Sequence, residues 1–152
     1  MVTRRELLIA SIAAGTTLCM TAWLRAAAPV LSSSIFDWNT MTVETTAVGA
    51  RRALFRAPTA TLDELECHIT TLNPGQTSHA PHRHPEEEIL IVREGTVESL
   101  VNGKLQRVGA GSVIFQASNQ EHAICNVGDT PATYHVFSWK SPGMGSKTAA
   151  TP

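Results

Sequence analysis

Three histidines and three consecutive glutamates crowd into one short stretch of the chain, HAPHRHPEEEILIVREG at residues 79–95. His82 and His84 stand two residues apart, so an extended backbone would project both imidazoles from the same face. Glu88 has the same parity if the strand continues past Pro85. Imidazole and carboxylate groups are ligands for divalent transition metals. The stretch alone predicts either a metal site or a solvated charge cluster in front of a strand.

A fourth candidate ligand lies far along the chain. His122 opens the β-prone run HAICN and could join the other three side chains only if the strands close against each other. Four candidates in two distant segments favour the metal site, because a lone H-x-H would more often be solvated.

These two segments together resemble the two motifs of the cupin superfamily. The motifs are His82-x-His84-x3-Glu88-x6-Gly95 and Gly111-x5-Ala117-x-Asn119-x2-His122-x3-Asn126. The resemblance covers roughly residues 40–140. It implies an all-β fold, a single jelly-roll-like β-barrel, in which one divalent metal is bound by His82, His84, Glu88 and His122.

The chain departs from the family pattern in its turns. Gly75 lies one residue further from His82 than the family's glycine, and Ala117 and Asn119 replace a proline and a glycine. Asparagine can adopt the left-handed conformation that the missing glycine would supply, so we expect the turn at Asn119 to be kept. None of these changes removes a ligand.

The predicted ligand set leaves the metal and the reaction open. Three imidazoles and one carboxylate suit iron, manganese, nickel, zinc or copper, and would leave two positions of a six-coordinate ion free. The resemblance implies a metal-dependent enzyme of the oxygenase, isomerase or decarboxylase type, with a dioxygenase as one option, acting on a small polar molecule. The alternative is a non-catalytic module that binds a metal or a small ligand.

Several other polar residues near the motifs receive weaker predictions. His79 is expected at the rim of the site, Glu86 and Glu87 in solvent, and His68 on the solvent-facing side of its strand. Gln116 and Gln120 are candidates to orient a bound water. Either alternate set of the run ATYHVFSW could line the barrel, Tyr134, Val136 and Ser138 or His135, Phe137 and Trp139.

The elements that must position these residues are short β-prone runs separated by turn signals. The expected strands are residues 41–48, 50–57, 64–72, 87–95, 96–101, 104–109, 112–116, 122–127 and 132–139. Asn102-Gly103 predicts a two-residue type I′ hairpin, which needs positive φ at both residues. No sustained helical period follows residue 34, so the pattern predicts an all-β sandwich or barrel.

The N-terminus resembles a twin-arginine export signal, with Arg4-Arg5 ahead of a charge-free stretch. We expect residues 1–33 to be a signal helix or an N-terminal anchor, residues 34–140 the cupin domain, and residues 141–152 a flexible tail. The protein would then be periplasmic or secreted, or anchored in the membrane and facing the periplasm, with the cleavage site left open.

Composition limits the partners. The chain has 12 basic and 13 acidic residues among 152, so no charge excess points to nucleic acid. We expect a small-molecule partner, and membrane contact only through an uncleaved signal. A homodimer is one option, since edge strands favour pairing. Cys67 and Cys125 could pair after export, although two separate thiols are favoured.

Overall fold

The computed structural model describes residues 28–144. Apart from a 3₁₀ residue at Met144, the regular elements within this range are all strands. Residues 1–27 of the expected signal segment and most of the expected tail lie outside these residues, and residues 28–33 form no helix. The nine strands are β1 (Glu44–Thr46), β2 (Gly49–Ala57), β3 (Glu64–Leu72), β4 (Glu87–Glu94), β5 (Thr96–Val101), β6 (Lys104–Gly109), β7 (Val113–Gln116), β8 (Ala123–Asn126) and β9 (Ala132–Lys140). Among the described residues, no helix is long and apolar enough to cross a bilayer.

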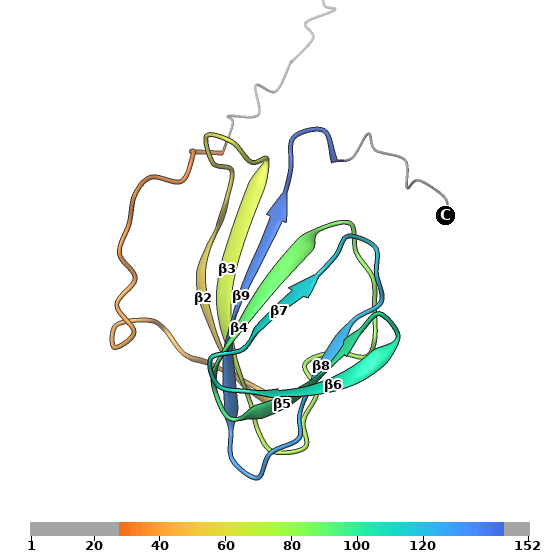
Figure 1. Cartoon of the computed structure of the whole chain (residues 1–152). Helices are drawn as coiled ribbons and strands as arrows, with labels where there is room; N and C mark the ends of the chain where they lie inside the picture. The colour runs from red at the N-terminus through yellow and green to blue at the C-terminus, as the bar shows by residue number, and fades with distance from the viewer. Residues whose placement is uncertain (1–27, 145–152) are drawn as a thin grey trace, which may run out of the picture.

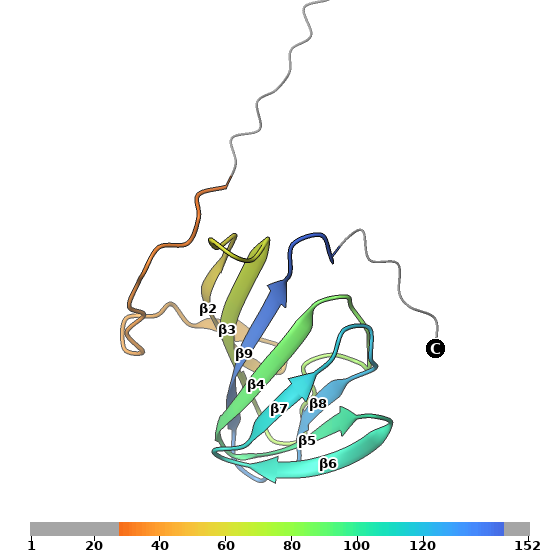
Figure 2. The same ribbon diagram turned by 45° about the horizontal axis from the view of Figure 1, so that its top comes forward.

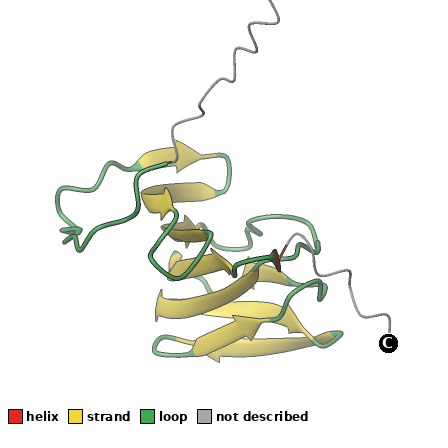
Figure 3. Cartoon of the chain, turned by 90° about the horizontal axis from the view of Figure 1, so that it is seen from above, coloured by secondary structure: helices red, strands yellow, loops and turns green. Residues whose placement is uncertain are grey.

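The strands form two antiparallel sheets. The larger has the order β1-β2-β3-β9-β4-β7 and the smaller the order β6-β5-β8. Figures 1 and 2 show the smaller sheet lying against the β4 and β7 side of the larger one. Figure 3 shows the molecule from above, with the strands layered over one another and joined by loops at their ends. The predicted all-β fold is confirmed, as two facing sheets rather than a closed barrel.

Apolar side chains fill the space between the two sheets. The larger sheet contributes Leu72, Leu90, Val92, Ile114, Ala132, Tyr134 and Val136, and the smaller one Val97 and Ile124. Burying such side chains is the main stabilising contribution, and each needs the strand period of two to face inward. The core therefore fixes which face of β3, β4 and β9 looks into the molecule.

Turn residues have the backbone conformations that the sequence predicts. Asn102 and Gly103 have φ angles of 52° and 71°, as a type I′ hairpin between β5 and β6 requires. Asn119 has a φ of 58°, so it does take the left-handed conformation in place of the family's glycine. Gly95 has a φ of 81°, and a Cβ there would lie 2.6 Å from the Cα of Ala132.

Candidate metal centre

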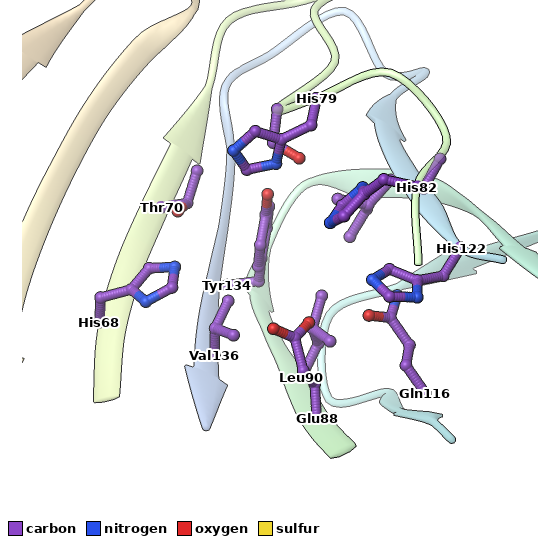
Figure 4. Close-up of a pocket in the computed structure, with 13 residues that line it drawn as sticks. His68, Thr70, His79, His82, Glu88, Leu90, Gln116, His122, Tyr134 and Val136 are labelled. Carbon is purple, nitrogen blue, oxygen red and sulfur yellow. The ribbon is translucent and has the colours of Figure 1, made fainter. Parts of the chain in front are cut away.

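The three histidines of the two motifs meet beside a cavity between the sheets, which His82 and His122 line. One ring nitrogen from each of His82, His84 and His122 lies within 4.8 Å of the others, so the three imidazoles could hold a metal ion. The ring of His122 is 4.5 Å from that of His82 and 4.7 Å from that of His84, measured between centroids. Figure 4 shows His82 and His122 side by side at the cavity.

The backbone brings the two motifs together by a short bridge rather than by one long strand. β4 begins only at Glu87, so His82 and His84 lie in the loop before it and not on a strand that continues past Pro85. The backbone N–H of His82 donates to the carbonyl of His122 at 3.2 Å, and the reciprocal bond measures 3.1 Å. The sequence predicted that a continuous strand would align the side chains of the first motif on one face. Instead, the isolated bridge between His82 and His122 brings the two motifs together.

The backbone also fixes the tautomer of each imidazole. The Nδ1–H groups of the three histidines donate to carbonyl oxygens, that of His82 to Ala80 at 3.1 Å, that of His84 to Glu86 at 3.1 Å, and that of His122 to Gln120 at 2.8 Å. A carbonyl can only accept, so in the neutral rings Nε2 keeps its lone pair. Metal-binding histidines are commonly oriented in this way.

His122 shows most directly that the cluster fits a cation. Its side chain is 5% exposed, and its Nε2 is buried without a hydrogen-bond partner among the described residues. Burial lowers the pKa of His122, which keeps the ring neutral and its lone pair free. A buried acceptor without a partner is costly, and a bound metal ion would satisfy it.

Glu88 reaches the same cluster from β4. Its Oε1 lies 3.4 Å from Nε2 of His84, and Figure 4 shows the carboxylate directed into the cavity. Burial raises the pKa of Glu88, while His84 and His82 oppose that rise. Gln116 faces Glu88 across the β4–β7 pair, and its buried Oε1 has no partner within residues 28–144. Both side chains could complete a shell, and ligation by the four predicted residues stays a prediction.

The surrounding residues differ in part from expectation. His79 lies at the cavity with its ring 5.4 Å from that of His82, and burial lowers its pKa. Glu86 is not simply solvated, because its carboxylate is 3.4 Å from both His84 Nδ1 and Lys140 Nζ. Of the two alternate sets on β9, the one containing Tyr134 and Val136 lines the cavity.

His68 was expected in solvent, and that prediction is wrong. The cavity, of about 70 Å³, is lined by His68 and Thr70 of β3 together with His82, Glu88 and His122. The alternation of side chains along a strand already puts His68 and Thr70 on the same face of β3. Which face of β3 points into the cavity depends on how the strand packs, and the residues of β3 alone do not determine it. Cys67 and Cys125 are separate free thiols, as favoured.

Comparisons with known proteins agree with the fold. Residues 68–138 match the family model described as the cupin domain. The L-ectoine synthases of Bordetella parapertussis and Bordetella bronchiseptica are 30% identical over 59 residues, which is 38% of this chain and 45% of each synthase. The chain thus matches less than half the length of these curated relatives.

Two solved structures show the likeness in three dimensions. An RmlC-like cupin from Shewanella frigidimarina superposes with a TM-score of 0.60 at 18% identity, covering 73% of this chain and 94% of that one. A protein described as a predicted oxalate decarboxylase from Thermotoga maritima gives 0.57 at 21% identity, covering 70% and 99%. The family match over residues 68–138 and these likenesses in structure support a cupin-type fold.

Proposed function

We propose that this protein is a metal-dependent enzyme that acts on a small polar molecule. One divalent transition metal would be bound by His82, His84, Glu88 and His122. The observation that carries the proposal is the buried Nε2 of His122, which has no hydrogen-bond partner within residues 28–144. It lies beside the imidazoles of His82 and His84, and Nδ1 of each of the three rings donates to a backbone carbonyl. When bound, such a cation supplies Lewis-acid activation of an oxygen atom of the substrate.

The chain's own residues would bind and shelter the substrate. Leu90, Ile124 and Val136 line the cavity, so they would exclude water from the reacting atoms. The cavity of about 70 Å³ admits only a small molecule or one end of a larger one. The curated relatives are named as synthases, which supports an enzyme rather than a passive binding module.

Metal content is the first test. We expect about one metal ion per chain in protein purified after expression with its N-terminus intact, and most of that metal lost from His122→Ala. His135→Ala is the matched control, because His135 lies on the face of β9 opposite to the Tyr134 and Val136 set that lines the cavity. Equal metal content in the wild type and His122→Ala would refute the site.

Turnover separates an enzyme from a binding module. Oxygen uptake should be screened with catechols, thiols and 2-oxo acids, and the same mixtures analysed for non-oxidative products. Any turnover that disappears in His122→Ala and persists in His135→Ala supports the enzyme. Tight binding of a compound without turnover would favour the module instead.

We also propose export by the twin-arginine route, which the Arg4-Arg5 pair supports. That route carries folded proteins, so a metal could be loaded before transit. The test is the distribution of the full chain between cytoplasm and periplasm. Replacing both arginines with lysine should retain the protein in the cytoplasm, and unchanged export would contradict the proposal.

A further inference from the structure

A further imidazole lies on the wall of the cavity opposite the histidine cluster. His68 extends from β3 into the cavity, with Glu88 between it and His122 (Figure 4). Its side chain is only 19% exposed, and the cavity next to it is walled by Leu90 and Val136. In the sheet, Val136 of β9 pairs with His68 of β3 on one side and with Leu90 of β4 on the other. The ring therefore meets the cavity beside two apolar side chains.

A carboxylate fixes which nitrogen of His68 carries the proton. Nδ1 of His68 lies 3.2 Å from Oε1 of Glu66. An ionised carboxylate only accepts, so Nδ1 donates its hydrogen and Nε2 keeps a lone pair. In Figure 4 the ring projects from β3 toward the cavity, with Nε2 at its leading side.

Two guanidinium groups hold that carboxylate in place. Arg51 Nη2 lies 3.1 Å from Oε1 of Glu66, and Arg56 Nη1 lies 3.4 Å from Oε2. Glu66 thus connects a pair of cations on β2 to an imidazole in the cavity. A carboxylate so held can both orient the ring and stabilise a positive charge that forms on it.

The charges around His68 favour a neutral ring before reaction. Burial lowers the pKa of His68, Arg51 on β2 and His79 in the loop add to that effect, and Glu66 on its own strand opposes it. A neutral, sheltered imidazole with one free lone pair is suited to accept a proton from a bound molecule.

We propose that His68 is a catalytic general base and acid, that Glu66 positions it, and that the substrate is a small carbonyl compound with a removable hydrogen next to the carbonyl. This inference rests on the proposed function. The choice of substrate follows from the small size of the cavity, about 70 Å³. A proton acceptor on one wall and a cation-binding cluster on the other must act on atoms close together, such as a C–H bond and the neighbouring C=O.

The proposed step consumes no oxidant. The C–H bond breaks, its proton forms an N–H bond with Nε2 of His68, and the electron pair moves through the adjacent carbon to the carbonyl oxygen, giving an enolate. The imidazolium keeps its Nδ1–H bond to Glu66. Returning the proton to the same carbon exchanges or inverts it. Where that carbon also bears a hydroxyl group, the intermediate is an enediolate. Moving the hydroxyl proton to the former carbonyl oxygen, and the proton on His68 to the former carbonyl carbon, then isomerises the substrate. Among the reaction types considered, this favours the isomerase type.

The tautomer of His68 is the first test and needs no substrate. Nitrogen-15 NMR of the metal-free and zinc-loaded full chain, assigned with His68→Gln, should show hydrogen on Nδ1 of His68. Glu66→Gln should shift the population toward hydrogen on Nε2. Glu64→Gln is the matched control, since Glu64 pairs with Arg56 and Lys140 and does not line the cavity. A dominant Nε2–H tautomer in the unsubstituted chain would overturn the assignment.

Deuterium exchange is the second test. Pyruvate, hydroxyacetone and dihydroxyacetone are incubated with the metal-loaded chain in D2O, and incorporation next to the carbonyl is followed by proton NMR. We expect exchange to fall by about 100-fold or more in His68→Gln at unchanged metal content. Exchange that is absent with all three probes, or equal in the variant, overturns the role of His68 while metal binding stands. A chain without metal overturns the proposed function instead, and the tautomer then decides on His68 alone.

Discussion

Asn119 links the turn of the second motif to the loop of the first. Its backbone has a φ of 58°, and its N–H donates to the carbonyl of His84 at 2.8 Å. Left-handed backbone costs roughly 1–2 kcal/mol for an ordinary residue, and glycine and asparagine largely avoid that cost. Replacing Asn119 therefore tests whether this backbone conformation positions His84.

We predict that Asn119→Gly keeps both stability and metal binding, whereas Asn119→Ala loses about 1 kcal/mol of unfolding free energy. The alanine variant should also bind zinc more weakly, because the peptide that contacts His84 shifts. Urea unfolding and zinc titration measure the two effects. If the alanine variant equals the glycine variant in both, the left-handed turn does not matter to the site.

Cys67 is a buried thiol whose chemistry can be predicted from its surroundings. It is 2% exposed, and burial raises its pKa to about 11. The thiolate is the reactive form, so at pH 8 nearly all of Cys67 is the unreactive thiol, and reactivity would rise only toward pH 11. We expect iodoacetamide to modify Cys67 in guanidinium but not in buffer at pH 8, as mapped by mass spectrometry. The half-buried Cys125 is the internal comparison, and rapid native labelling of Cys67 would contradict the prediction.

How far the site could be predicted from sequence differs from residue to residue. Residue types and spacing were enough to select the three histidines that meet, because ligand chemistry is local. The reason given for their meeting was wrong, since a bridge between His82 and His122 does what strand parity was expected to do. The position of His68 could not be predicted from β3 alone, because both faces of that strand are partly buried.

At the scale of elements, Asn126 connects three segments of the backbone. Its side chain is fully buried, and its Nδ2 donates to the carbonyls of Leu72 at 2.9 Å and Thr130 at 2.8 Å. Its Oδ1 accepts from the N–H of Gly128 at 2.9 Å. The side chain thereby joins the end of β8 to the end of β3 and to the turn before β9.

We predict that Asn126→Ala lowers the free energy of unfolding by about 3 kcal/mol, because three backbone groups lose their partner in the interior. Urea unfolding with an unchanged slope would measure it. Asn73→Ala serves for comparison, because Asn73 is an exposed loop residue whose φ is not positive. A loss below that of the control would show that water replaces these bonds.

Strand positions were largely predictable, and their sheet partners were not. All nine expected runs contain a strand, because turn residues and period-two patterns act over a few residues. The run at residues 41–48 forms only the three-residue β1. The neighbours of β9, which are β3 and β4, depend on contacts distant in sequence that no local pattern encodes.

At the scale of the whole molecule, the segment ahead of β1 is part of the fold. Trp38 contacts two arginines on strands that are not neighbours, Arg52 of β2 at 4.2 Å and Arg93 of β4 at 3.6 Å from the ring centroid. β3 and β9 lie between those strands in the sheet. Phe36 adds a ring contact with Phe55, 5.4 Å between centroids. The segment therefore ties the two halves of the larger sheet together.

Removing the indole should loosen this connection without disturbing the cavity. Each cation–π contact is worth roughly 0.5–1 kcal/mol at an exposed site and more where water is excluded, so we predict a loss of about 2 kcal/mol for Trp38→Ala. Limited proteolysis should then cut the segment ahead of β1, while zinc affinity stays at the wild-type value. Ile35→Ala, in the same segment but 96% exposed, should change neither stability nor proteolysis. If Trp38→Ala instead behaves like Ile35→Ala, the two arginines hold the segment without contributing to stability. If zinc affinity falls as well, the contacts of Trp38 with the larger sheet also help to position the histidine cluster.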